Sequence, residues 1–135
     1  MLRMSQPPLW RILWRILWPA PWSLLGLLLG TCMLACGGRV QAQQGTLEFS
    51  GGALARLPWP MDGITFGHVI LGRSAAHLAL LRAHEQVHVR QYERWGLLFV
   101  PAYLSESAWQ WLRGQRAYFD NRFECAARAD EKRIS

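Results

Sequence analysis

The sequence predicts an α+β domain that follows a hydrophobic N-terminal leader or anchor helix. A charge-free run covers residues 22–36, short segments of alternating polarity lie between residues 46 and 71, and three segments with helical periodicity follow. We therefore expect a small antiparallel sheet of three or four short strands and then three helices. A chain of 135 residues has room for one domain. We assign residues 1–44 to a signal peptide or membrane anchor with a linker, and residues 45–135 to the domain.

The leader has the charge distribution of an exported or membrane-anchored chain. Residues 1–44 contain four arginines and no acidic residue, and three of the arginines precede the charge-free run. Val40-Gln41-Ala42 offers small-residue cleavage after Ala42, whereas residues 19–38 are long enough for one membrane span. A cleaved leader and a retained anchor both remain open. In either case the arginine flank should stay in the cytoplasm, which places the domain on the extracytoplasmic side.

Tryptophan recurs every four residues in the leader, at Trp10, Trp14, Trp18 and Trp22. On a helix this spacing forms one aromatic stripe, which is typical of the lipid headgroup region. We interpret the stripe as an amphipathic interfacial helix, broken near Pro19, that brings the chain to a membrane. The alternative is an aromatic leader that is removed.

The net charge of +6 at pH 7 does not indicate a nucleic-acid partner. Residues 43–135 hold eleven Lys and Arg against nine Asp and Glu, which leaves +2. No basic run with interleaved aromatics, zinc-finger spacing or helix-turn-helix spacing follows. We expect no nucleic-acid binding.

Four β segments are expected in the first part of the domain. Residues 46–49 alternate in polarity, and Ser50-Gly51-Gly52 predicts a hairpin turn into residues 53–57. Residues 64–66 and 68–71 resume a β pattern up to Gly72. These segments account for the small antiparallel sheet.

Helices are expected at about residues 74–95, 101–113 and 121–132. Ser74 can open the first, Pro101 fits the first turn of the second, and Gly114 fits its end. The second is apolar enough to suggest another membrane span. Glu106 at its middle argues against a span, because a carboxylate in hydrocarbon is unfavourable.

The first of these helices carries His84-Glu85-Gln86-Val87-His88, an HExxH pattern. Positions i and i+4 share a helix face, so both imidazoles can bind one metal ion. Glu85 lies beside them, where it could take a proton from water in the open metal position. The alternative is a helix that carries two histidines without a metal. The absence of glycine and proline between residues 75 and 95 favours the metal site.

A catalytic zinc ion needs a third protein ligand. No histidine follows His88, which excludes the HExxHxxGxxH arrangement and favours a carboxylate. We choose Glu124, because it lies on a separate helix with Ala126 and Ala127 nearby, which lets two helices approach closely. Alternatively, Asn121 is an N-cap and Glu124 completes its capping box. The other candidate ligands are Glu93, Glu106, Asp120, Asp130, Glu131, His68 and His77.

Residues 83–88 and 121–127 together resemble the gluzincin type of zinc metallopeptidase, in which a glutamate on a later helix completes HExxH. The likeness covers about residues 64–130 and extends to small bacterial membrane-associated or exported proteins with a minimal zincin core. It implies His84, His88 and Glu124 as Zn²⁺ ligands, with Glu85 as the general base. It further implies that Asp130 orients a histidine and that residues 66–71 form the strand lining the substrate cleft.

The expected function is zinc-dependent hydrolysis of peptide or protein substrates outside the cytoplasm, by a zinc-bound water with Glu85 as general base. A domain of about 90 residues is small for a peptidase, and its transition-state donor is open among Tyr92, Tyr103, Tyr118 and His68. Tyr118 is attractive because it precedes the Glu124 helix. The alternative is a non-catalytic, zinc-stabilised envelope protein that binds a partner or has a structural role. Glu85 favours chemistry, because a structural zinc needs no general base. A protein whose activity lies only in the leader is a third possibility.

Overall fold

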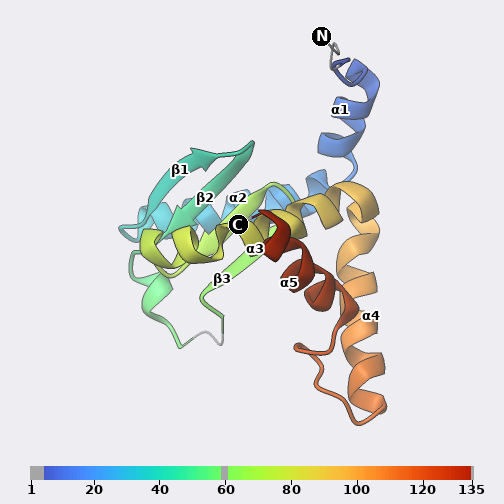
Figure 1. The fold of residues 1–135 in the computed structure, drawn as a ribbon. Helices are drawn as coiled ribbons and strands as arrows, with labels where there is room; N and C mark the ends of the chain where they lie inside the picture. Colours follow the sequence, from blue (N-terminus) through green and yellow to red (C-terminus); the bar gives the residue numbers. More distant parts are fainter. Residues whose placement is uncertain (1–4, 59–60, 135) are drawn as a thin grey trace.

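The computed structural model describes residues 5–58 and 61–134. They form an α+β fold with a four-stranded mixed sheet (Figure 1). In chain order the elements are α1 (Leu9–Leu17), α2 (Ala20–Ala35), β1 (Arg39–Gln43), β2 (Thr46–Ser50), the 3-10 helix η1 (Leu54–Arg56), β3 (Gly63–Phe66), β4 (Val69–Gly72), α3 (Ala75–Trp95), the 3-10 helix η2 (Gly96–Leu98), α4 (Phe99–Leu112) and α5 (Arg122–Ile134).

The strand order is β1-β2-β4-β3, so β3 forms one edge of the sheet. β1 pairs with β2, and β3 with β4, in antiparallel hairpins, whereas β2 and β4 run parallel with Phe49 opposite Leu71. The expectation of an antiparallel sheet was therefore wrong for the central pair. Residues 54–56 form η1 instead of the expected strand at 53–57, and the chain crosses over before β3.

β1 occupies part of the segment that we expected to be a linker. Val40 and Ala42 alternate with polar residues along β1, but every side chain is exposed or half-buried, so neither face of the strand is buried. The hairpin depends instead on Gln44 and Gly45, which both adopt positive φ, at 51° and 77°. Two consecutive residues of positive φ match the twist of a tight antiparallel hairpin.

α2 covers one face of the sheet (Figure 1). Met33 is buried against Phe49, Val69 and Leu71 in the larger core cluster. Gly30 permits this approach, because a Cβ there would lie 2.6 Å from the Phe49 ring. The segment that we expected to be a leader or anchor is thus one layer of the fold. No single helix within the described residues is long and apolar enough to cross a membrane; α1 and α2 together are, but they are bent by 57°.

α3 covers the opposite face of the sheet. Leu78 and Val89 bury Ile70, which has no exposed surface. Two polar contacts lock α3 in register with β2: Arg82 Nε lies 2.9 Å from Glu48 Oε2, and Gln86 Nε2 donates to Thr46 Oγ1 at 2.9 Å. If α3 rotated, these polar groups would lose their hydrogen bonds, which is unfavourable for a group shielded from water. The two contacts therefore fix the rotation of α3.

The three C-terminal helices confirm the expected boundaries closely. The Ser74 hydroxyl caps α3 by accepting from the His77 backbone N–H at 3.1 Å. Pro101 lies in the first turn of α4, and Gly114, with φ of 77°, follows its end. α5 packs alongside α3 (Figure 1). Ala127 is fully buried, which allows the close approach of helices expected around it.

Candidate metal centre

Three side-chain atoms from α3 and α5 converge on one point. His84 and His88 lie one turn apart on α3, and their Nε2 atoms are 3.2 Å from each other. Glu124 Oε2 of α5 lies 2.9 Å from His84 Nε2 and 3.2 Å from His88 Nε2. His88 and Glu124 are buried, and the side chain of His84 is only 12% exposed. The structure therefore brings Glu124 to two histidines that lie 36 and 40 positions earlier in the chain.

The spacing of these atoms fits one small cation. A tetrahedral zinc ion with bonds of about 2.0–2.1 Å separates its ligand atoms by about 3.3 Å. The observed separations of 2.9–3.2 Å come within a few tenths of an ångström of that value. The triad could hold a metal ion with three protein ligands, and a fourth position would stay open.

The contacts of Asn121 fix the position of the α5 N-terminus, and with it the direction of Glu124. The Asn121 side chain is fully buried, and its Oδ1 accepts from the Phe123 backbone N–H at 2.8 Å, as an N-cap does. Its Nδ2 donates to the Tyr103 carbonyl and to Ser107 Oγ on α4. Asn121 thus caps α5 and ties it to α4, while the Glu124 carboxylate faces the histidines. Asn121 is therefore the cap of this segment, and Glu124 stays available as a candidate ligand.

The outer nitrogen of each imidazole also has a partner. His84 Nδ1 lies 3.2 Å from Glu131 Oε2, and His88 Nδ1 lies 2.8 Å from Gln91 Oε1. Gln91 is itself held by donating to the Phe123 carbonyl at 3.0 Å. Such contacts at Nδ1 orient the rings so that Nε2 faces the centre, as is usual for metal-binding histidines.

The electrostatics of the triad favour a cation at its middle. The hydrogen bond to Glu124 raises the pKa of His84 above its usual value, against the effect of burial. Burial lowers the pKa of His88, but the hydrogen bond and charge of Glu124 outweigh it and the net shift is upward. Burial alone would raise the pKa of Glu124, yet the two imidazoles hold it well below its usual range. The raised histidine pKa values and the lowered Glu124 pKa both reflect attraction between the carboxylate and positive charge at the imidazoles.

Glu85 stands beside the triad without joining it. Its Oε2 accepts a hydrogen bond of 2.5 Å from the Thr65 hydroxyl on β3, and both residues are buried. Glu85 lines a pocket of about 260 Å³ together with His88 and Glu124, and Tyr103 and Tyr118 form part of the same wall. A carboxylate in this position can exchange protons with a molecule held in the pocket.

β3 provides one wall of this pocket, through residues 63–66. We expected the cleft strand at residues 66–71, but most of that segment is β4, an interior strand. The edge strand reaches the centre because Thr65 points toward α3 while its neighbours Ile64 and Phe66 pack against the α2 side. The alternation of side chains along β3 therefore turns Thr65 toward Glu85, while Ile64 and Phe66 contribute both to the core and to the pocket wall.

Two of the other expected site residues lie elsewhere. Asp130 is paired with Arg133 at 4.0 Å, and the carboxylate at His84 belongs to Glu131. Glu131 follows Glu124 by seven residues, which is close to two helical turns and returns to the same face; this spacing could have identified it. His68 lies in the turn before β4, where its Nε2 is 3.9 Å from Glu93 Oε2, outside the pocket.

The two pocket tyrosines differ in their contacts. Tyr103 donates a hydrogen bond of 2.6 Å to Glu124 Oε1. Tyr118 lines the pocket as expected, with its side chain about half exposed. Burial raises the pKa of both hydroxyls, that of Tyr118 to about 12, so both stay protonated at neutral pH. The Tyr118 hydroxyl can donate to an oxygen in the pocket, whereas the one hydroxyl proton of Tyr103 is engaged with Glu124. Sequence reasoning missed the supporting roles of Thr65, Gln91 and Glu131.

Comparison with protein-family models, curated proteins and solved structures found no significant match to this chain. The geometry of His84, His88, Glu124 and Glu85 is therefore the basis for assigning a function.

Proposed function

We propose that this chain is a zinc-dependent peptidase of minimal zincin type. One observation carries the proposal: two imidazole nitrogens and a carboxylate oxygen meet at metal-binding distances, and a second buried carboxylate, Glu85, stands beside them without being a ligand. A structural metal site needs a fourth ligand and no free carboxylate, whereas a hydrolytic site needs both an open position and a base.

The donor set favours zinc over other common cations. Magnesium and calcium prefer oxygen ligands, and two of the three donors here are imidazole nitrogens. Zinc accepts a mixed nitrogen and carboxylate set, and catalytic zinc sites combine three protein ligands with one exchangeable position. His84, His88 and Glu124 would hold the ion.

The chain's own residues can supply the remaining chemistry. When bound, zinc lowers the pKa of a coordinated water toward about 7 and polarises a carbonyl. Glu85 would accept the proton of the attacking water and pass it to the leaving amine. Thr65 holds the carboxylate of Glu85 in place. Tyr118 lines the same pocket, and its hydroxyl would donate to the oxygen that gains negative charge.

The edge position of β3 supports a peptide as substrate. An extended peptide can add to an exposed sheet edge through backbone hydrogen bonds, and β3 has a strand neighbour on one side only. Because Thr65 on this strand contacts Glu85, a peptide laid along the edge would pass beside the general base and the triad.

The extracytoplasmic location stays a prediction from the arginine flank of the leader. A reporter fused after Ser135 tests it. Activity of a periplasmic-type reporter would support the predicted side, and a signal from a cytoplasmic reporter would contradict it.

The proposed function is tested by metal content and hydrolysis in the full chain. We expect about one zinc ion per chain by elemental analysis, and loss of that ion in His84→Ala and in His88→Ala. Glu85→Gln should keep the zinc, since Glu85 is not a ligand, and reduce cleavage of a peptide library by about two to four orders of magnitude. Absence of bound metal under non-chelating conditions would refute the proposal. Zinc without cleavage in the wild type would favour the scaffold alternative.

A further inference from the structure

α2 is built into the folded domain through small residues that face the sheet. A Cβ at Gly26 would lie 2.8 Å from the Val69 Cβ, and one at Gly30 would meet the Phe49 ring. Met33, further along the helix, is 7% exposed. Cleavage after Ala42 would remove α2 and most of β1, and would open the apolar face of β2 and β4 to water. Exposing such a core is strongly destabilising.

The junction between α1 and α2 is fixed against the junction between α3 and α4. The Trp18 ring packs on Gly96, where a Cβ would collide with the indole. Pro19 is fully buried, and Trp22 Nε1 donates to the Leu97 carbonyl at 3.0 Å. The C-terminal end of α1 is therefore anchored to the domain, and its direction is set by these contacts.

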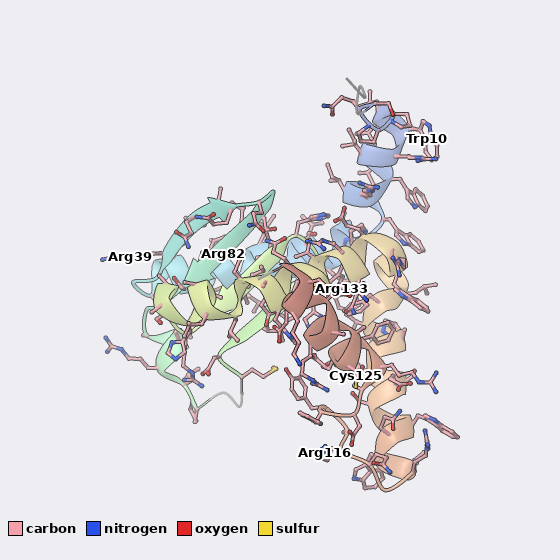
Figure 2. All side chains as sticks on the ribbon, viewed as in Figure 1. Trp10, Arg39, Arg82, Arg116, Cys125 and Arg133 are labelled. Carbon is pink, nitrogen blue, oxygen red and sulfur yellow. The ribbon has the colours of Figure 1, made fainter. Side chains whose placement is uncertain are left out.

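α1 itself has no buried residue. Trp10 is 65% exposed and Trp14 56% exposed, and Figure 2 shows Trp10 at the far end of a helix that projects from the body. The other exposed apolar side chains of α1 are Leu9, Ile12, Leu13, Ile16 and Leu17. Isolated helices of nine residues are marginal in water, so an exposed apolar helix of this length is expected to need a partner surface.

The charges of α1 indicate the kind of surface that its exposed apolar side chains would contact. Arg11 and Arg15 are four residues apart and share one helix face, so the apolar side chains occupy the rest of the circumference. Residues 1–47 contain no acidic side chain. A helix with arginine on a narrow polar face and Trp and Leu elsewhere is typical of helices that lie in the membrane interface and are attracted to anionic lipids.

We propose that α1 is a retained interfacial helix that attaches the folded chain to an anionic phospholipid surface while α2 stays on the sheet. A membrane span is disfavoured, because α1 is only about 14 Å long against a hydrocarbon core of about 30 Å. α2 cannot complete a span without leaving Phe49 and Val69 uncovered, and the two helices are bent by 57°. The proposal is independent of the zinc chemistry, so either can fail alone.

The test is sedimentation of the full chain with vesicles of phosphatidylcholine alone or with about a third of phosphatidylglycerol. We expect binding to the anionic vesicles that weakens as salt is raised. Arg11→Gln with Arg15→Gln should weaken that binding about thirty-fold, since each arginine near an anionic surface contributes about fivefold. Trp10→Ala with Trp14→Ala should weaken it at least about tenfold, because the interfacial aromatic contacts are lost.

Trp109→Ala with Trp111→Ala is the matched control. These α4 tryptophans are 52% and 69% exposed, and Arg113 lies over the Trp109 ring as Arg11 lies over Trp10. The control should keep wild-type binding and, like the α1 variants, the wild-type melting temperature. A wild-type chain that remains in the supernatant, or equal losses in the control, would overturn the proposal. So would a mature N-terminus at Gln43, or α1 variants that dissociate a dimer without changing vesicle binding.

Discussion

The Tyr103 hydroxyl on α4 donates a 2.6 Å hydrogen bond to Glu124 Oε1, the carboxylate oxygen that does not approach His84. Oε2 lies 2.9 Å from His84 Nε2 and 3.2 Å from His88 Nε2. Oε1 itself lies 3.2 Å from His88 Nε2, so the bond from Tyr103 holds the whole carboxylate against the two imidazoles.

Tyr103→Phe should weaken zinc binding by about tenfold or more, because outer partners of metal ligands usually contribute 10- to 100-fold in affinity. The ring contacts of Tyr103 with Phe99 and Phe123 are kept in this variant, so its thermal stability should change little. Competition with a fluorescent zinc chelator measures the affinity. Tyr92→Phe is the control, since the Tyr92 hydroxyl donates to the Thr65 carbonyl and not to Glu124, and an equal loss there would contradict the assigned role.

Glu131→Gln should weaken zinc binding by about 10- to 100-fold, because the neutral amide supports the His84 ring less strongly than a carboxylate. Asp130→Asn, one position earlier, should leave the affinity unchanged, since Asp130 pairs with Arg133. Titration calorimetry of both variants separates the two carboxylates. A larger effect at Asp130 than at Glu131 would show that the α5 face toward the centre is assigned wrongly.

Thr65→Val should lower kcat by about ten- to a hundredfold while leaving zinc content and KM nearly unchanged. Valine keeps the size of threonine but removes the donor that fixes the Glu85 carboxylate, and small misplacements of a catalytic group have effects of this size. Thr65→Ser retains the hydroxyl and should restore most of the rate. A serine variant as slow as the valine variant would indicate a packing effect instead.

Zinc and protons should compete at the triad. The pKa values of His84 and His88 are raised in the metal-free chain, mainly through Glu124. Groups with raised folded-state pKa values stabilise the fold fully below their unfolded value of about 6.5, and this stabilisation is lost as pH rises through the folded value. Denaturant midpoints of the metal-free chain should therefore fall as pH rises above about 6.5.

Zinc affinity should change in the opposite direction over the same range, rising by up to about tenfold per pH unit for each proton released on binding. Parallel titrations at several pH values measure it. Affinity independent of pH would show that the imidazoles are already neutral in the free chain. His84→Ala should flatten the pH dependence of the denaturant midpoint and abolish zinc binding at every pH.

The sequence by itself determined the elements whose causes are local. Ser74 as N-cap and the absence of glycine and proline from the residues after it specify α3. The helical period alone places His84 and His88 on one face. The two ends of α4 also have local causes. Pro101 favours the first turn of a helix, and Gly114 can adopt the positive φ that follows a helix end. The strands at residues 64–66 and 68–71 were also readable, because each has a local β pattern.

Only the tertiary structure decided the contacts between distant segments. The parallel pairing of Phe49 with Leu71 depends on the path of the chain after β2, and the burial of Met33 depends on how α2 meets the finished sheet. In the sequence Glu124 fitted both a capping box and a metal ligand. In the structure Asn121 caps α5 and bonds to α4, and the Glu124 carboxylate faces His84 on α3. Local patterns constrain backbone conformation, whereas the direction of a buried side chain is set by packing against residues tens of positions away.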